Sequence, residues 1–360
     1  MTRALIIAEA GVNHNGCLET ALKLVDTAAE AGADYIKFQT FKAEALVSRT
    51  AALASYQKIH SNKGSQFELL KSLELSPEMH TAIRSHCQKR GIKFLSTPFS
   101  EADADYLEEY VAFFKVPSGE ITNLPFLAHL ARKQKNLILS TGMATMDEVK
   151  EAKSTVFEVW NNKGFPKAEE QLPGPLTFLH CTSAYPASFS DVNLLAIQTL
   201  ARETACPVGY SDHTRGIEVS IAAVVLGAVV IEKHFTLSRR LPGPDHKSSL
   251  EPEELKALIS SIRNVEIALG SEEKHPSEEE VENAGVVRKS LHYKHSLKAG
   301  TSIDSEMLII KRPGTGLAPK NLKLLLGKVL KRDVSQDQIR SEEHTSELRH
   351  AITSRMPSSA

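Results

Sequence analysis

Residues 207–234 read PVGYSDHTRGIEVSIAAVVLGAVVIEKH, and this stretch contains one pattern twice. Each copy begins with a short apolar run, at residues 207–210 and again at residues 228–231. Three polar residues that end in a histidine follow each run directly. The long apolar stretch 219–231 lies between two glutamates; it is too short to span a bilayer and predicts buried core.

The same kind of run occurs eight times in the first two-thirds of the 360-residue chain. Stretches with helical spacing of apolar residues border most of the runs. Two of these end at Gly32 and Gly91, and a third begins at Thr145 with Glu148 at the capping-box position. Eight alternations of strand and helix favour an α/β fold of the (β/α)8 TIM-barrel type over an open sheet. The runs are residues 4–8, 35–38, 93–95, 113–116, 137–139, 176–179, 207–210 and 228–231.

Polar or ionisable residues stand at the end of all eight runs. In a closed parallel barrel the carboxyl ends of the strands meet at one face, where barrel enzymes hold their catalytic residues. Solvation alone does not explain the pattern, because the opposite ends of the strands would suit polar residues equally well. The sequence therefore predicts an active site at the carboxyl face.

The composition excludes several classes of protein. Apolar residues make up 41% and charged residues 24%, which is ordinary for a globular chain and excludes a largely disordered one. A balance of 43 basic and 44 acidic residues gives a net charge of −1, which argues against nucleic acid or membrane as the main partner. The N-terminus shows no signal-peptide pattern, and the four scattered cysteines lack metal or disulfide spacing. We therefore expect reduced thiols in a cytoplasmic protein.

Two domains are expected, with the barrel at residues 1–270. Residues 41–74 form a long insertion after the second run and predict a lid or a substrate loop. Residues 271–285 are a charged linker, and residues 286–339 carry short β-like pieces and turn signals. So small a β-rich domain lies near the lower limit for independent stability, and we expect it to lean on the barrel or on another subunit.

The last segment, residues 340–360, reads RSEEHTSELRHAITSRMPSSA and has almost no apolar periodicity, which predicts disorder. Residues 340–348 and 354–360 resemble the two ends of a translated sequencing adapter. We interpret the segment as an assembly artefact and expect the small domain to be truncated near residue 339.

The two histidines of the opening stretch, His213 and His234, end neighbouring runs, so their imidazoles can share one metal ion. The alternative is two ordinary hydrogen-bonding histidines. Glu9 would add an acidic partner across the barrel axis. Such nitrogen and oxygen ligands without thiolate suit Mn²⁺, Co²⁺, Fe²⁺ or Zn²⁺ better than a structural zinc site.

Two lysines, Lys37 and Lys115, stand at the barrel ends of apolar runs. Because burial of an unpaired ammonium is costly, a lysine at this position usually faces an anion, although it can also extend to the rim. With the hydroxyls of Ser96, Thr97, Ser118 and Ser211, the pair would bind a phosphate or carboxylate. A Schiff-base lysine is the competing interpretation.

Four carboxylates are candidates for proton transfer or for binding sugar hydroxyls, although each alone is more often structural: Glu9, Glu120, Asp212 and Asp245. The sequence contains no GxGxxG, P-loop or GxSxG motif, so hydride transfer, kinase and serine-hydrolase functions lose their usual support.

Ten motifs, which follow one another over nearly all of residues 1–339, resemble the sialic acid synthase family. The last of them, with residues 286–339, resembles the antifreeze-like (SAF) domain of these enzymes. The motifs are IIAEAGVNHNG (6–16), IKFQTF (36–41), FLSTPF (94–99), KVPSGEITNLP (115–125), ILSTGMA (138–144), LHCTSAYPA (179–187), VGYSDHT (208–214), IEKHFTL (231–237), LPGPDHKSSLEP (241–252) and IKRPGTG (310–316).

The resemblance implies that phosphoenolpyruvate condenses with an open-chain N-acetylated hexosamine. The products would be a nine-carbon 2-keto sugar acid and phosphate. A divalent metal, commonly Mn²⁺, would be held by His213 and His234 and would polarise the sugar aldehyde. Glu9 would act in proton transfer, and Arg312 would reach the sugar from the SAF domain of a partner subunit in a domain-swapped homodimer.

The resemblance assigns the remaining residues to two groups. Phosphoenolpyruvate would contact Lys37, Thr97, Lys115, Ser118, Ser183 and Ser211, which supply the donors that an anion needs. The sugar side would be lined by Gln39, Glu120, Tyr185 and Asp245. Some relatives have Asn in place of Ser183, which weakens that assignment.

Several alternatives stay open. The acceptor can be N-acetylmannosamine, which gives neuraminic acid, or a 2,4-diacetamido-trideoxyhexose, which gives legionaminic or pseudaminic acid. A synthase of seven- or eight-carbon phosphorylated keto acids would need more basic residues and no SAF domain. A metal-dependent amidohydrolase would show His-x-His after the first strand, where this chain has Asn13-His14-Asn15. A binding protein built on the SAF domain would not need the lysines and histidines.

Overall fold

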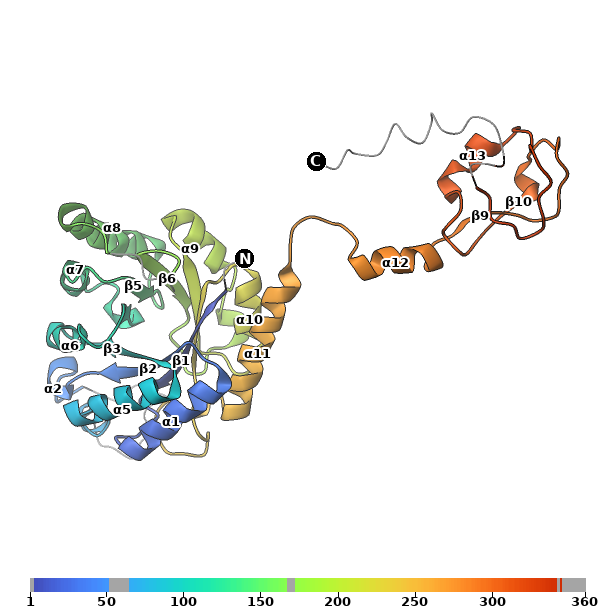
Figure 1. The fold of residues 1–360 in the computed structure, drawn as a ribbon. Helices are drawn as coiled ribbons and strands as arrows, with labels where there is room; N and C mark the ends of the chain where they lie inside the picture. Colours follow the sequence, from blue (N-terminus) through green and yellow to red (C-terminus); the bar gives the residue numbers. More distant parts are fainter. Residues whose placement is uncertain (1–2, 52–64, 167–171, 342–343, 345–360) are drawn as a thin grey trace. The chain divides into compact units, whose positions relative to one another are not determined.

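The computed structural model describes residues 3–51, 65–166, 172–341 and 344 (Figure 1). The chain divides into two compact units, Met1–Gly270 and Ser271–Ala360.

The first unit is a TIM barrel of eight parallel strands. Neighbouring strands pair in the order β3-β2-β1-β8-β7-β6-β5-β4, and contacts between β3 and β4 bring the sheet round to a nearly closed barrel. The strands are β1 (Leu5–Gly11), β2 (Tyr35–Thr40), β3 (Lys93–Pro98), β4 (Phe114–Val116), β5 (Leu137–Ser140), β6 (Leu176–Cys181), β7 (Val208–Asp212) and β8 (Val230–His234).

Helices cover the outside of the barrel, and their ends follow local signals in the sequence. Gly32 and Gly91 stop two of them in the left-handed conformation, at φ 85° and 71°. Thr145 and Glu148 form the predicted capping box. The helices are α1 (Leu18–Ala31), α2 (Ala43–Leu46), α4 (Gln66–Lys71), α5 (Pro77–Arg90), α6 (Glu101–Leu107), α7 (Leu124–Arg132), α8 (Met146–Lys163), α9 (Ala196–Thr204), α10 (Glu218–Val225) and α11 (Pro252–Leu269).

All eight predicted runs are barrel strands, which confirms the predicted fold class. Several strands continue past the apolar run into the polar residues, as β7 does to Asp212 and β8 to His234. These polar residues stay in the sheet because they pair with the neighbouring strand, as Glu9 of β1 does with Lys37 of β2. One apolar cluster fills the barrel and the space beneath its helices.

The insertion at residues 41–74 folds in part as α2 and α4. Phe41, Leu69 and Leu73 form a small apolar cluster with Val12 of the turn after β1. Residues 52–64 of the predicted lid lie outside the described residues.

The second unit has a small core of its own. Strands β9 (Ser290–Tyr293) and β10 (Leu308–Lys311) pair antiparallel, and the short helix α13 (Leu322–Leu325) packs beside them. The core residues are Leu291, Tyr293, Ile303, Leu317, Leu325, Leu330 and Val334.

Two segments of this unit differ from the sequence-based expectation. The charged linker contains a helix, α12 (Glu278–Val287), because Ser277 and Glu280 form a capping box at its start. Arg340 and His344, within the segment expected to be disordered, are buried, and Arg340 pairs through its backbone with Leu291 and Leu317. The rest of that segment, apart from Ser341, lies outside the described residues.

The apolar stretch 219–231 forms most of α10 and the start of β8 rather than one long helix. Across the described part of the chain, no helix combines the length and apolar character needed to cross a membrane.

Candidate active site

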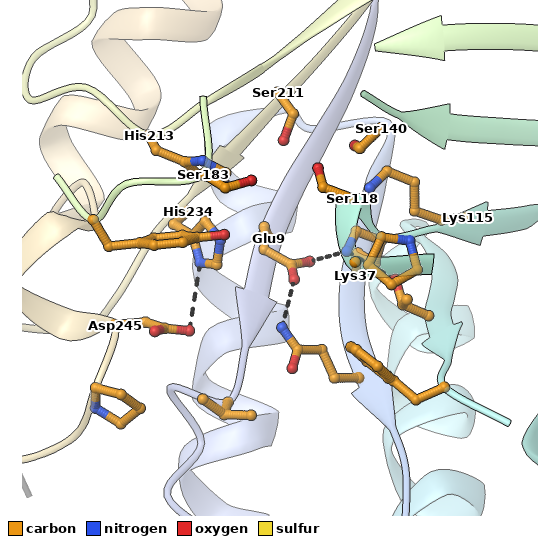
Figure 2. A pocket seen from close by; sticks show the side chains of 18 of the residues that line it. Glu9, Lys37, Lys115, Ser118, Ser140, Ser183, Ser211, His213, His234 and Asp245 are labelled. Carbon is orange, nitrogen blue, oxygen red and sulfur yellow. Dashed lines mark hydrogen bonds and ion pairs between the residues drawn. The ribbon is translucent and has the colours of Figure 1, made fainter. Parts of the chain in front are cut away.

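A cavity of about 520 Å³ opens at the carboxyl ends of the barrel strands (Figure 2). It brings together twelve of the fourteen residues predicted for the site, from seven of the eight strands or the turns that follow them. The twelve are Glu9, Lys37, Gln39, Thr97, Lys115, Ser118, Ser183, Tyr185, Ser211, His213, His234 and Asp245.

A buried ion pair joins Glu9 of β1 to Lys37 of β2. The two residues stand opposite each other in the strand register, and Lys37 Nζ lies 2.8 Å from Glu9 Oε2. Lys37 also donates to Thr97 Oγ1 at 3.0 Å, and Gln39 Nε2 donates to Glu9 Oε1 at 3.3 Å. Burial raises the pKa of the Glu9 carboxyl above its ordinary value, although Lys37 opposes the shift.

Glu232 of β8 is a central site residue that the sequence analysis did not select. Its carboxylate lies 3.6 Å from Lys37 Nζ and 3.3 Å from Lys115 Nζ, and it accepts from Ser211 Oγ at 3.0 Å. Burial alone would raise the pKa of Glu232, but Lys115 and Lys37 outweigh it and hold the pKa below its ordinary value. The available signal was its position two residues before His234, which places both side chains on one face of the strand.

The two lysines respond differently to the two carboxylates, because burial lowers the pKa of Lys115 although Glu232 opposes the shift. Burial by itself would lower the pKa of Lys37, but Glu232 and Glu9 outweigh it and raise that pKa. An ammonium without such partners would be driven to lose its proton in a buried site.

Hydroxyl groups gather beside Lys115. Gly142 N donates to Ser118 Oγ at 3.0 Å, and the Ser118 hydroxyl also forms a hydrogen bond with the thiol of Cys181. A Cβ on Gly142 would collide with Ser183 Oγ and lie 2.7 Å from Ser118 Oγ. Only glycine at this position lets the two hydroxyls lie this close to the backbone of residue 142. Ser140, a second residue that the analysis missed, lines the cavity, and its buried Oγ has no hydrogen-bond partner among the described residues.

The two histidines stand side by side at the ends of β7 and β8. Their ring centroids are 5.4 Å apart, and the ring of Tyr185 lies 4.2 Å from that of His213. His213 Nδ1 lies 2.8 Å from the carbonyl oxygen of Thr182, which leaves Nε2 for another partner. Asp245 Oδ2 is 3.9 Å from His234 Nδ1 (Figure 2).

These residues fit a divalent cation held by two imidazoles. The buried Nδ1 of His234 has no hydrogen-bond partner among the described residues, and burial lowers the pKa of this imidazole well below its ordinary value. A neutral imidazole is the form that binds metal. The described part of the chain contains no group of three or more metal-ligating side chains, so the remaining coordination positions would fall to water or substrate.

Two predicted residues are not brought into the cavity. Glu120 is half-buried beside it and accepts from Asn123 Nδ2 at 2.7 Å. Arg312 is an exposed residue of the second unit, directly after β10.

Asp212, the fourth candidate carboxylate, faces away from the cavity. It forms a buried ion pair with Lys233 at 2.8 Å and accepts hydrogen bonds from Thr214 and Ser220. Its oxygens are thus occupied by structural partners.

One wall of the cavity is apolar, which the sequence analysis did not predict. Most of its residues come from the insertion after β2 and the others from the turns after β1 and β3. They are Val12, Leu46, Val47, Leu69, Leu70, Leu73 and Phe99, and the polar side chain of Gln66 in α4 lines the cavity beside them.

A model of the NeuB family matches residues 24–274, and a model of the SAF domain matches residues 288–339. The chain belongs to the NeuB family. Among relatives of the family, the N,N'-diacetyllegionaminic acid synthase of Legionella pneumophila is 49% identical over 341 residues, which cover 94% of each chain. The protein of the same name from Campylobacter jejuni is 46% identical over 94% of this chain and 99% of its own.

Solved structures place the fold in the same family. The N-acetylneuraminic acid (sialic acid) synthetase of Leptospira borgpetersenii aligns with a TM-score of 0.65 and 34% identity, over 78% of this chain and 90% of that chain. Membership of the NeuB family confirms the resemblance to sialic acid synthases.

Proposed function

We propose that this chain is a transferase that condenses phosphoenolpyruvate with an open-chain N-acetylated amino sugar. The products are a nine-carbon 2-keto sugar acid of the sialic acid type and phosphate. The observation that carries the proposal is the cavity, where two buried lysines and several hydroxyls lie beside a carboxylate and a pair of histidines. The names of the 49% and 46% identical relatives support it.

The lysines bind the phosphate and carboxylate of phosphoenolpyruvate. Lys37 and Lys115 supply charge, and the hydroxyls of Thr97, Ser118, Ser183 and Ser211 supply further donors. Binding of the anion adds negative charge beside Glu9 and Glu232. Lys37 and Lys115 would then pair both with the substrate and with these two carboxylates.

Glu9 handles the proton of the attacking water. Carbon 3 of phosphoenolpyruvate attacks the sugar aldehyde and forms the new C–C bond, which leaves positive charge at carbon 2 and negative charge on the former aldehyde oxygen. Water adds at carbon 2, and Glu9 accepts one of its protons, while the former aldehyde oxygen takes up a proton and becomes a hydroxyl. The C–O bond to phosphate then breaks, and the remaining proton of the water leaves with the phosphate as the ketone forms. The elements of one water molecule are consumed, and one phosphate is released per keto acid.

His213 and His234 would hold the divalent cation, which is Mn²⁺ on the family resemblance. When bound there, the cation supplies Lewis-acid polarisation of the sugar aldehyde. Tyr185 packs against both imidazole rings and limits their rotation. Asp245 and Gln39 face the space left for the sugar.

The apolar wall favours a 2,4-diacetamido-trideoxyhexose as acceptor, so the product would be of the legionaminic or pseudaminic acid type. This sugar carries a methyl group at C6 and an acetamido group at C4, where N-acetylmannosamine has hydroxyls. Leu46, Val47 and Leu70 offer those hydroxyls no hydrogen-bond partner, whereas a methyl group gains by leaving water.

Arg312 would complete the sugar site from a second copy of the chain, as a domain-swapped homodimer. Its exposed position after β10 and the match of residues 288–339 to the SAF domain support this assignment.

Phosphate release tests the function. Purified protein with Mn²⁺ and phosphoenolpyruvate is expected to release phosphate when a 2,4-diacetamido-trideoxyhexose is added. With N-acetylmannosamine we expect kcat/KM to be at least about tenfold lower than with the trideoxy sugar, because the hydroxyls of N-acetylmannosamine would face the apolar wall. Absence of turnover with every amino sugar would refute the enzyme, and preference for N-acetylmannosamine would refute the assigned acceptor.

Val47→Thr tests the wall itself. Val47 lines the cavity, and the substitution keeps the side-chain shape while it replaces one methyl group with a hydroxyl. We expect kcat/KM for the trideoxy sugar to fall by roughly tenfold, while kcat/KM for N-acetylmannosamine holds or rises. Val225→Thr, at an exposed site on α10, is the matched control and should change neither value. Equal losses with both sugars would contradict the role of the wall.

A further inference from the structure

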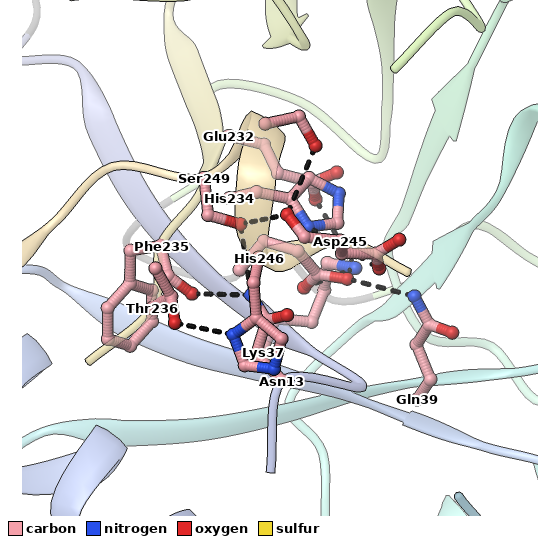
Figure 3. Close-up of polar contacts among 12 residues, drawn as sticks. Asn13, Lys37, Gln39, Glu232, His234, Phe235, Thr236, Asp245, His246 and Ser249 are labelled. Atoms are coloured by element: carbon pink, nitrogen blue, oxygen red, sulfur yellow. Dashed lines mark hydrogen bonds and ion pairs between the residues drawn. The ribbon is translucent and has the colours of Figure 1, made fainter. Parts of the chain in front are cut away.

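The motif Asn13-His14-Asn15 of the turn after β1 has no role in the proposed chemistry, yet it is bound closely to another segment. Asn13 is 1% exposed, and its Nδ2 donates to the carbonyl oxygen of Phe235 at 2.8 Å and to Ser249 Oγ at 3.0 Å (Figure 3). Both acceptors belong to residues 235–250, which we name the β8 loop because it follows that strand.

Ser249 links Asn13 to Asp245 through two hydrogen bonds. Its hydroxyl receives the hydrogen bond from Asn13 and donates to the carbonyl oxygen of Asp245 at 2.6 Å (Figure 3). A second hydroxyl, that of Ser248, donates to the same carbonyl at 3.1 Å. Buried hydrogen bonds that run from Asn13 through Ser249 therefore hold the backbone of Asp245 in place.

Asn15 makes a second connection to the β8 loop through His246. Asn15 Oδ1 lies 3.2 Å from His246 Nε2, and His246 Nδ1 lies 2.6 Å from Thr236 Oγ1. Burial lowers the pKa of His246 to about 4, so near pH 7 the neutral ring has one N–H to donate and one nitrogen to accept.

Close packing at Gly243 makes this arrangement specific. A Cβ on Gly243 would lie 2.8 Å from Asn15 Oδ1 and 2.7 Å from His246 Cδ2, at a φ of +145° that side chains rarely adopt. The loop thus comes near enough to Asn15 only because residue 243 is glycine.

The base of the β8 loop is closed by backbone hydrogen bonds. Leu250 N donates to the carbonyl oxygen of His234 at 2.9 Å, and Thr236 N donates to that of Leu250 at 2.8 Å. These bonds hold the two ends. Near the start of the loop Arg239 pairs with Glu254 of α11 at 2.9 Å, and the interior beyond it is held to the barrel by Asn13 and Asn15. Asp245 lies in that interior, 3.9 Å from His234 Nδ1 and on the wall of the cavity.

We propose that Asn13 and Asn15 are positioning residues, which hold the β8 loop so that Asp245 faces the acceptor side of the active site. They touch no substrate themselves and act through Ser249 and His246. The inference rests on the proposed function, since it assigns Asp245 to the sugar rather than to phosphoenolpyruvate.

The kinetic test uses Asn13→Ala with both substrates varied. We expect KM for the amino sugar to rise by about tenfold, and KM for phosphoenolpyruvate to stay within about twofold, because misplacement reaches only the sugar side. Asn161→Ala, at an exposed position on α8, is the matched control and should leave both values unchanged. A uniform loss of kcat with both KM values unchanged would overturn the positioning role.

A second measurement does not depend on activity. The β8 loop carries exposed Arg240 and Lys247, so trypsin reports whether the loop is held. Asn13→Ala should be cleaved after these two residues at least about tenfold faster than the unmodified protein, while the rest of the barrel resists. Equal cleavage rates would overturn the inference.

A milder variant covers the case in which Asn13→Ala does not fold. Asn15 has a positive φ of 52°, which glycine adopts freely, so Asn15→Gly removes the side chain without straining the turn. It should also speed cleavage after Arg240 and Lys247. If the unmodified protein shows no turnover, the proposed function fails, whereas turnover with unchanged cleavage and sugar KM in both variants refutes only the positioning role.

Discussion

Replacing Glu9 with Gln is expected to lower kcat for phosphate release by about 10³-fold while the barrel stays folded. The amide keeps the shape of the side chain but cannot accept the proton of the attacking water. Lys37 retains a carboxylate partner in Glu232, at 3.6 Å, so the loss of Glu9 does not leave its ammonium isolated. Initial rates at saturating phosphoenolpyruvate and sugar measure the effect.

Two controls separate chemistry from folding in this experiment. Glu158→Gln makes the same change at an exposed position of α8 and should keep full activity. Thermal unfolding of Glu9→Gln should show one transition, which demonstrates a folded barrel. A kcat within twofold of the unmodified protein would show that Glu9 does not move the proton.

Removal of either histidine of the pair is expected to abolish high-affinity Mn²⁺ binding and to lower kcat by more than about 10²-fold. The described part of the chain contains no group of three or more metal-ligating side chains, so the loss of either histidine would leave the cation with a single imidazole. The free Mn²⁺ signal in electron paramagnetic resonance measures binding without reference to turnover. His213→Ala and His234→Ala should each leave that signal equal to buffer.

The control for these variants is His295→Ala, an exposed histidine of the second unit. It should bind Mn²⁺ as the unmodified protein does. Treatment of the unmodified protein with a chelator should stop turnover, and added Mn²⁺ should restore it. Full activity in His213→Ala would refute the assignment of the metal ligands.

The barrel fold could be predicted from the sequence because the patterns that indicate its strands and helices are local. A barrel strand is indicated by a short apolar run. A helix is indicated by apolar residues at helical spacing and by a cap, such as the capping box of Thr145 and Glu148, and both signals lie in residues close together in the sequence. The polar residues after the runs could be assigned to one site because strands that are all parallel carry their carboxyl ends to the same face.

The site was only partly accessible, for a reason that Glu232 and Glu120 illustrate. Both are glutamates near the end of a strand, and the chain itself does not state which way either side chain points. Glu232 lies between two lysines inside the barrel, whereas Glu120 follows a turn and ends outside the cavity. Both follow an apolar run, so residue type and position along the chain do not distinguish them, and only the folded barrel does.

By itself the sequence determined the barrel, the second domain, the family and most of the residues around the cavity. Only the tertiary structure decided the charge balance between the lysines and Glu232, the apolar wall and the bonds from Asn13 to the β8 loop. The physical reason is distance along the chain. Asn13 and Ser249 are 236 residues apart, and a hydrogen bond of 3.0 Å between them exists only once the strands have closed into a barrel.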